Sequence, residues 1–237
     1  TVAWEPLGWT PVAFAEIEPF PSAVLSYRYP NVPNLGDVVQ LRNQLVSGED
    51  VAGLLSDPPD IVVGGSPCQA FSIAGSRSGL SCDRGNLTLV YAEIVNAIKP
   101  RYIVWENVPG VLSMRDNAFG HLLGALAGED GQLQPPGRRW SNAGAVLGPE
   151  RAIAWRILDA QYFGVAQQRR RVFLVASRRD GSAKDPWEIL FESDGVRRDT
   201  APCREAGQTV AGTLASRTEG GASRARTKPA GGICSPS

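Results

Sequence analysis

The sequence predicts an α/β fold with a mostly parallel sheet. Several short apolar runs end at glycine, asparagine or an acidic residue, and segments with helical periodicity follow them. That order is typical of strands that feed helices on the faces of a sheet. The chain has 237 residues, of which 43% are hydrophobic, so it can bury the core of one domain, or of one and a half.

Four short apolar runs are expected to form buried strands. They cover residues 12–15, 60–63, 102–105 and 171–175. Helices are expected after Pro19 and Pro21, and from the capping residue Asn86 to Ile98. The spacing of apolar residues also predicts an amphipathic helix over residues 152–158.

Two segments do not fit this alternation. Residues 131–149 contain Pro135, Pro136 and four glycines, so we expect a surface insertion there. Beyond about residue 180 the pattern fails, and from Ala201 to the end apolar residues are too sparse for a core, so we expect residues 181–237 to be a linker and the start of a further region. The folded unit is therefore expected within residues 1–180.

Composition narrows the class of protein. No apolar run approaches the roughly 18 residues of a membrane span, and the first residues lack a secretory pattern, so we expect a cytoplasmic protein. The four cysteines form no Cys-x-x-Cys pair and His121 is the only histidine, so neither a metal site nor a disulfide framework is expected.

The net charge is zero, but it is unevenly distributed. Residues 1–60 hold eight acidic residues against two arginines, whereas residues 138–179 hold nine arginines against two acidic residues. We expect the arginine-rich stretch to face a polyanion while the acidic part faces away. Charge alone is equally compatible with an unevenly charged soluble protein.

A candidate nucleophile lies in the run Gly-Gly-Ser-Pro-Cys-Gln-Ala-Phe-Ser at residues 64–72. Cys68 follows a predicted strand, and open α/β sheets bind their ligands at the carboxyl ends of strands. A single cysteine is also often a small buried hydrophobic residue. Glu106 and Asn107 follow the next predicted strand, so an acid and an amide would face the same crevice.

A third polar run, Gln167 to Arg171, precedes a predicted strand. In an extended segment Gln167, Arg169 and Arg171 share one face, where they could hold a phosphate or a base edge. Such a run is also often a solvated strand edge.

Taken together and in this order, these segments resemble the cytosine-C5 DNA methyltransferase family, especially its bacterial and phage members. The run at 64–72 is similar to the family's nucleophile motif, Glu106-Asn107-Val108 to its acid motif, and Gln167-x-Arg169-x-Arg171 to its arginine motif. Ala15-Glu16-Ile17 and Leu35-Gly36-Asp37-Val38 are similar to cofactor-binding segments. The resemblance spans residues 1–180 and implies a Rossmann-like fold that uses S-adenosyl-L-methionine.

The resemblance also implies roles for single residues. Cys68 would add to C6 of a cytosine flipped out of double-stranded DNA, so that C5 can accept a methyl group. The implied catalytic residues are Cys68, Glu106, Arg169 and Arg171. The implied substrate contacts are Gln69, Ser72, Asn107 and Gln167. The implied cofactor contacts are Glu16, Ile17, Asp37, Val38, Pro67 and Leu87.

The sequence also departs from the family's pattern. The first strand with its glycine-rich turn, most of the target recognition region and the closing motif are not seen, and Ala166 replaces the usual proline. We therefore expect residues 1–237 alone to be inactive unless another segment supplies that strand. A restriction endonuclease of the same system is a possible partner.

Three alternatives stay open. One is a non-catalytic relative that binds DNA or a partner, and another is an RNA cytosine-C5 methyltransferase of the same fold. The third is a cysteine hydrolase, for which His121 is the only available histidine base.

Overall fold

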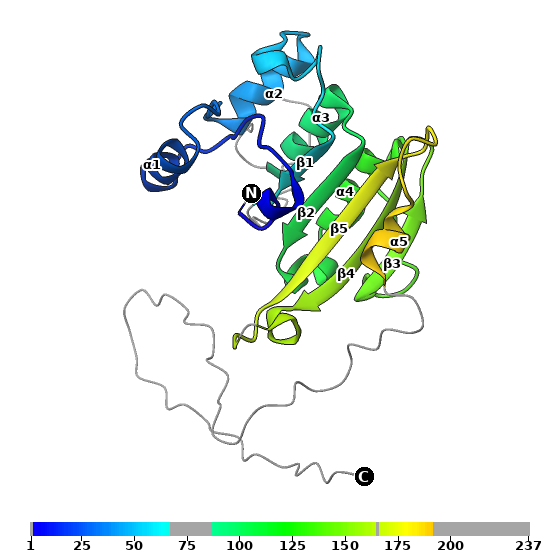
Figure 1. Ribbon diagram of the computed structural model, residues 1–237. Helices are drawn as coiled ribbons and strands as arrows, with labels where there is room; N and C mark the ends of the chain where they lie inside the picture. The colour runs from blue at the N-terminus through cyan, green and yellow to red at the C-terminus, as the bar shows by residue number, and fades with distance from the viewer. Residues whose placement is uncertain (1, 67–86, 165, 192–237) are drawn as a thin grey trace, which may run out of the picture.

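The computed structural model describes residues 2–66, 87–164 and 166–191. A five-stranded sheet in the order β1-β2-β5-β4-β3 lies at its centre (Figure 1). The strands are β1 (Ile61–Gly64), β2 (Tyr102–Asn107), β3 (Ala143–Leu147), β4 (Arg151–Asp159) and β5 (Arg170–Arg178). The helices are α1 (Pro19–Arg28), α2 (Val38–Val46), α3 (Leu87–Ile98), α4 (Ala118–Ala127) and α5 (Pro186–Leu190). Short 3-10 turns cover Glu5–Leu7, Val51–Gly53, Pro109–Ser113 and Ala160–Phe163.

The prediction of an α/β fold is confirmed, but the expectation of a mostly parallel sheet is wrong for the described strands. Only β1 and β2 pair in parallel, whereas β2–β5, β5–β4 and β4–β3 pair antiparallel. Short connections explain two of the three antiparallel pairs, β3–β4 and β4–β5. Ten residues join β4 to β5 and three join β3 to β4, and a parallel crossover needs a dozen or more.

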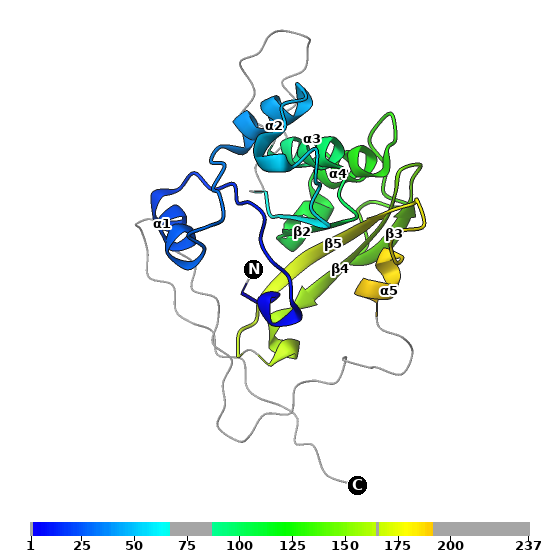
Figure 2. The same ribbon diagram turned by 45° about the horizontal axis from the view of Figure 1, so that its top comes forward.

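The predicted helix at residues 152–158 is wrong, because this segment is strand β4. All residues from Arg151 to Trp155 are buried. Helix α4 and helix α5 both contact β4, and they lie on opposite faces of the sheet (Figures 1 and 2). A strand covered on both faces loses its polar alternation, so its apolar spacing cannot be told from that of a helix.

Two further sequence predictions need correction. The expected insertion at 131–149 contains the edge strand β3, whose side chains alternate between exposed and half-buried. The expected strand at 12–15 is reduced to an isolated parallel bridge between Phe14 and Asn34. The predicted helices after Pro19 and up to Ile98 are confirmed as α1 and α3, and helix α5 packs on β4 and β5 just beyond residue 180.

The core lies between the sheet and helices α3 and α4, which cover one face (Figure 2). Trp105 of β2, Phe119 of α4 and Trp155 of β4 are buried there, with the Phe119 ring centroid 6.1 Å from that of Trp105 and 5.4 Å from that of Trp155. A second apolar cluster joins α2 to α3. None of the described helices has the length and apolar character that a membrane span requires.

Buried Tyr91 of α3 joins β1 to β2. Its hydroxyl donates to the backbone oxygens of Val62, at 3.3 Å, and Val104, at 3.1 Å. Burial raises the pKa of the phenol above its ordinary value, so the hydroxyl keeps its proton. The ring lies so close to Gly64 that a Cβ there would be 2.5 Å from a ring carbon. Only glycine therefore fits at the carboxyl end of β1.

We predict that Gly64→Ala destabilises the protein by about 1–3 kcal/mol, because the buried Tyr91 ring must move to make room for the added methyl group. Urea unfolding of the intact protein measures this difference. Gly110→Ala is the matched control, since a Cβ at Gly110 meets nothing within 4 Å in the described part of the chain. Equal stability of the two variants would contradict the close packing described here.

Candidate active site

The structure brings Glu106 and Arg171 together. Strands β2 and β5 are antiparallel neighbours, so the end of β2 lies beside the start of β5. Arg171 Nε lies 2.9 Å from Glu106 Oε1, and the two side chains are 23% and 36% exposed. An Arg171 terminal nitrogen also donates to the backbone oxygen of Arg170 at 2.8 Å. Two residues predicted to share a site therefore form a solvent-accessible ion pair.

The same carboxylate lies close to the chain that leads to Cys68. A Cβ built on Gly65 would be 3.3 Å from Glu106 Oε2. The carboxyl ends of β1 and β2 thus lie side by side, as parallel neighbours should. Four predicted site residues that follow in this chain lie outside the described residues. They are Pro67, Cys68, Gln69 and Ser72.

Asn107 is buried, at 5% exposure, and its amide is bonded to backbone. Its Nδ2 donates to the Ser66 oxygen at 2.8 Å, and its Oδ1 accepts from the Val108 N–H at 2.8 Å. These bonds hold the end of β2 to the chain leaving β1. The substrate contact implied for Asn107 stays a prediction, and the structure adds a positioning role.

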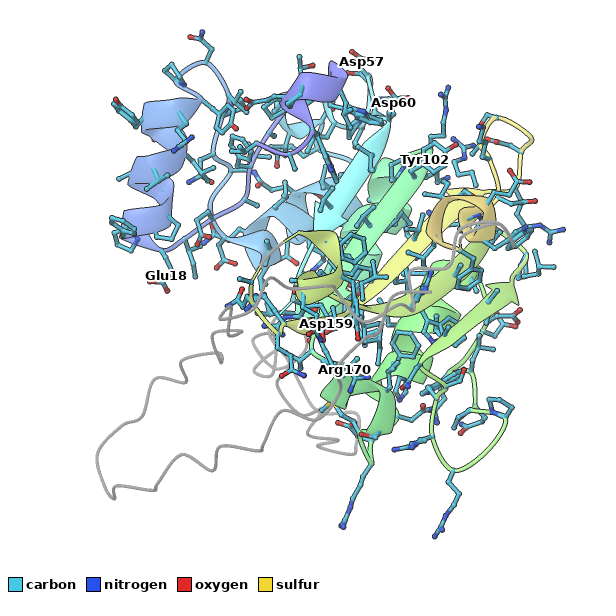
Figure 3. All side chains as sticks on the ribbon, turned by 60° about the horizontal axis from the view of Figure 1, so that its bottom comes forward. Glu18, Asp57, Asp60, Tyr102, Asp159 and Arg170 are labelled. Atoms are coloured by element: carbon cyan, nitrogen blue, oxygen red, sulfur yellow. The ribbon has the colours of Figure 1, made fainter. Side chains whose placement is uncertain are left out.

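Asp159 organises the start of the arginine motif. Its Oδ1 accepts from the Arg169 N–H at 2.9 Å and from the Gln161 N–H at 3.3 Å, while Oδ2 accepts from Gln161 Nε2 at 2.8 Å. Figure 3 shows Asp159 and Arg170 at one end of the sheet, with Asp60 and Tyr102 at the other. Gln167 and Arg169 precede the regular strand β5, whereas Arg171 lies within it. Sequence reasoning missed Asp159, whose only signal is an acid that directly follows an apolar run.

The expectation that the arginines of residues 138–179 face DNA together is wrong for Arg151. This side chain is 3% exposed, and it donates to Asn96 Oδ1 at 2.6 Å and to the Leu126 oxygen at 3.0 Å. Arg178 lies at the far end of β5, about 27 Å from Arg170 at the usual rise per residue of a strand. The positive charge is therefore divided between the two ends of the sheet.

The predicted cofactor residues Glu16 and Asp37 end two adjoining parallel segments. The Phe14 N–H donates to the Pro33 oxygen at 2.9 Å, and the Leu35 N–H donates to the Phe14 oxygen at 2.7 Å. The side chain of Asn34 binds the backbone N–H and the backbone oxygen of Glu16, each at 2.9 Å. The two carboxylates are thereby set at the same end of neighbouring segments.

The carboxylates of Glu16 and Asp37 can accept hydrogen bonds from the polar groups of a nucleoside. Glu16 Oε1 accepts from the Glu18 N–H, and Asp37 Oδ1 caps α2 by accepting from the Val39 N–H, each at 2.8 Å. The second oxygen of each carboxylate has no hydrogen bond within the described residues. Ile17 is 65% exposed and offers an apolar surface beside them. Val38 packs against the α2–α3 cluster, and Leu87 begins α3 half-buried.

The fold of the described residues is similar to the Rossmann-like fold of solved methyltransferases. A DNMT2 structure from Spodoptera frugiperda matches with a TM-score of 0.50 at 21% identity, over 76% of this chain and 46% of that one. The Dnmt2 methyltransferase of S. pombe also matches with a TM-score of 0.50, at 15% identity, over 79% of this chain and 49% of that one. At such identities the likeness concerns the fold.

The family follows from the sequence match. Residues 1–209 match the model of the C-5 cytosine-specific DNA methylase family, and the chain belongs to this family. Its members are methyltransferases that use S-adenosyl-L-methionine. The resemblance identified from the motifs is thereby confirmed.

Two relatives of this chain are longer proteins that it covers only in part. A protein of Escherichia phage P1 named DNA N-6-adenine-methyltransferase is 50% identical over an alignment 246 residues long, which covers 91% of this chain and 32% of that protein. Type II methyltransferase M.AquIA of Picosynechococcus is 30% identical over 179 residues, 75% of this chain and 66% of that protein. The chain thus spans about a third of the first relative and 66% of the second.

We predict that Gly65→Ala lowers kcat for methyl transfer about five- to tenfold, because the added methyl group displaces the Glu106 carboxylate from Arg171, and small displacements of catalytic groups are costly. Stability should stay within about 0.5 kcal/mol of the wild type, since Gly65 is exposed. Initial rates of tritiated methyl transfer by the intact protein test this, with Gly110→Ala as control. An unchanged kcat in Gly65→Ala would contradict the assigned role of Glu106.

Proposed function

We propose that this chain is the catalytic part of a DNA (cytosine-5-)-methyltransferase that acts through a covalent bond between Cys68 and C6 of a flipped-out cytosine. The observation that carries this proposal is the Glu106–Arg171 ion pair, which lies at the strand ends beside Gly65, three residues before Cys68. A base flipped out of DNA can reach this ion pair, because the Glu106 and Arg171 side chains are both partly exposed.

The chemistry explains why these residue types are needed. C5 of cytosine is a poor nucleophile until a thiolate adds to C6. Cys68 would form the Cys–C6 bond while the partly exposed Glu106 carboxylate takes up a proton from solvent and passes it to N3, so the electron pair of the C5–C6 double bond becomes available at C5. Arg171 would balance the charge of Glu106 and orient the base with its remaining N–H groups. After methylation, a water molecule takes up the C5 proton, the electron pair of the C5–H bond restores the C5–C6 double bond, and the Cys68 thiolate leaves from C6.

The cofactor would supply an electrophilic methyl group on a sulfonium. We assign its ribose hydroxyls to Glu16 and its adenine to Ile17 and Asp37. The second oxygen of each carboxylate, which no other described residue binds, and the exposed Ile17 side chain support this assignment. Val38, Pro67 and Leu87 would complete the same pocket.

The name of the phage P1 relative raises adenine-N6 methylation as a second candidate. In that reaction the exocyclic amine is itself the nucleophile, so no cysteine adduct is needed. The match to the C-5 cytosine family favours cytosine, as does the presence in the sequence of Cys68 three residues after Gly65, which lies close to the Glu106 carboxylate. The chain covers only 32% of the phage protein, so that name can refer to a part of it that this chain does not match.

We predict that Cys68→Ser in the intact protein lowers methyl transfer by at least about a thousandfold, because a hydroxyl is a far weaker nucleophile than a thiolate. A duplex carrying 5-fluorocytosine should trap a covalent adduct with the wild type, since the fluorine cannot leave as a cation. Cys82→Ser is the matched control and should still form the adduct.

The same assay separates the rival functions. Methyl transfer to adenine without an adduct would overturn the proposal in favour of the adenine reaction. Methylation of RNA but not of duplex DNA would reassign the substrate. Absence of both transfer and cofactor binding in the intact protein would indicate a non-catalytic relative.

We propose that double-stranded DNA binds at the end of the sheet where β5 begins. Exposed Arg170 lies there, and Arg178 lies at the opposite end, paired with Asp180 at 3.0 Å. A type II system with a restriction endonuclease partner is suggested by relatives such as M.AquIA.

We predict that Arg170→Ala weakens DNA binding and reduces the slope of log K against log salt by about 0.9, the contribution of one phosphate contact. Arg178→Ala should change neither quantity, because that arginine lies at the other end of the strand. Fluorescence anisotropy of a labelled duplex over a range of salt concentrations measures both. An effect of Arg178→Ala that equals that of Arg170→Ala would place the DNA elsewhere.

A further inference from the structure

Three side chains are joined at the base of the segment that carries Cys68. Ser66 Oγ lies 2.8 Å from Thr88 Oγ1, and it accepts a hydrogen bond from Trp105 Nε1 at 3.2 Å. Ser66 stands just before residues 67–86 and Thr88 just after them. We call these three residues the clasp, because they tie together both ends of the segment that contains the proposed nucleophile.

The hydrogen bonds of the clasp complete one another. The indole N–H of Trp105 can only donate, so Ser66 Oγ must accept from it. The Ser66 and Thr88 hydroxyls share a second hydrogen bond, in which either can donate. Trp105 is fully buried and Thr88 is 8% exposed. Water therefore cannot readily replace the Ser66 hydroxyl, and its loss would leave a buried donor without a partner.

The geometry of β2 connects the clasp to the proposed active site. Alternate residues of a strand face opposite sides, so Trp105 and Asn107 share one face and Glu106 lies on the other. Trp105 binds the Ser66 hydroxyl and Asn107 binds the Ser66 backbone oxygen. Ser66 is thus held at two points by the residues on either side of Glu106, while Glu106 itself contacts Arg171.

We propose that Ser66 is a positioning residue that, through Thr88 and Trp105, sets the placement of Cys68 relative to Glu106. This inference rests on the proposed function. Ser66 lies two residues before Cys68, and hydrogen bonds at both ends of a segment restrict the conformations that its residues sample. A nucleophile displaced by about 1 Å can lose on the order of a hundredfold in rate.

The test removes each hydroxyl in turn from the intact protein. Ser66→Ala and Thr88→Val should each slow formation of the 5-fluorocytosine adduct, and kcat, by about tenfold or more. KM for DNA and for S-adenosyl-L-methionine should change by less than about twofold, because neither hydroxyl belongs to the proposed binding residues. Ser182→Ala, which removes a serine hydroxyl bonded to Asp180 in a distant loop, should leave adduct formation unchanged.

Two readouts separate positioning from general stability. Thr88→Ser keeps the hydroxyl and should restore the wild-type rate, whereas Thr88→Val should not. The Ser66→Ala/Thr88→Val double variant should lose no more than Ser66→Ala alone, because Thr88→Val removes only the Ser66–Thr88 bond that Ser66→Ala already removes. Unchanged adduct rates in both single variants, or additive losses in the double variant, would overturn the clasp.

The clasp and the proposed function can fail separately. If the wild type forms no adduct with cytosine in duplex DNA, the proposed function is wrong. The clasp is then judged by limited trypsin cleavage after Arg77 and Arg84, which lie between its two ends. Faster cleavage in Ser66→Ala and Thr88→Val than in Ser182→Ala would support the clasp, and equal rates would overturn it.

Discussion

The double pairing of strand β2 is the constraint on which the proposed site depends. On one side β2 lies parallel to β1, so their carboxyl ends meet and Gly65 reaches Glu106. On the other side β2 lies antiparallel to β5, so its carboxyl end meets the start of the arginine motif at Arg171. The ends of β1 and β2 and the start of β5 are far apart in the chain. Backbone hydrogen bonds between the strands bring them together, independently of the side-chain contacts in the site.

The two faces of β2 have different roles, because alternate residues of the strand point to opposite sides of the sheet. Ile103, Trp105 and Asn107 are buried on one face. Trp105 binds the side chain of Ser66, and Asn107 binds its backbone oxygen. Glu106 is turned to the accessible face with Arg171. One residue cannot be both buried for rigid packing and open to solvent. In β2 the buried Trp105 and Asn107 supply the rigid contacts, and their neighbour Glu106 stays accessible.

The family match and the name of the phage P1 relative point to different target bases. The family is that of C-5 cytosine methylases, whereas the phage protein is named an adenine methyltransferase. The family match covers most of this chain, whereas the chain covers about a third of the phage protein. The proposal of a cytosine reaction rests on the family match, on Cys68 in the sequence and on the approach of Gly65, three residues before it, to the Glu106 carboxylate.

The sequence by itself determined the motifs, the α/β class and the helices α1 and α3, because capping residues and helical periodicity are local properties. It could not determine that residues 152–158 form β4, since burial on both faces removes the alternation that marks a strand. Nor could it show that Asp159 holds Arg169, that Arg151 is buried, or that Ser66 contacts Thr88 and Trp105. Those facts join residues distant in the chain or depend on which face is covered, so only the tertiary structure decided them.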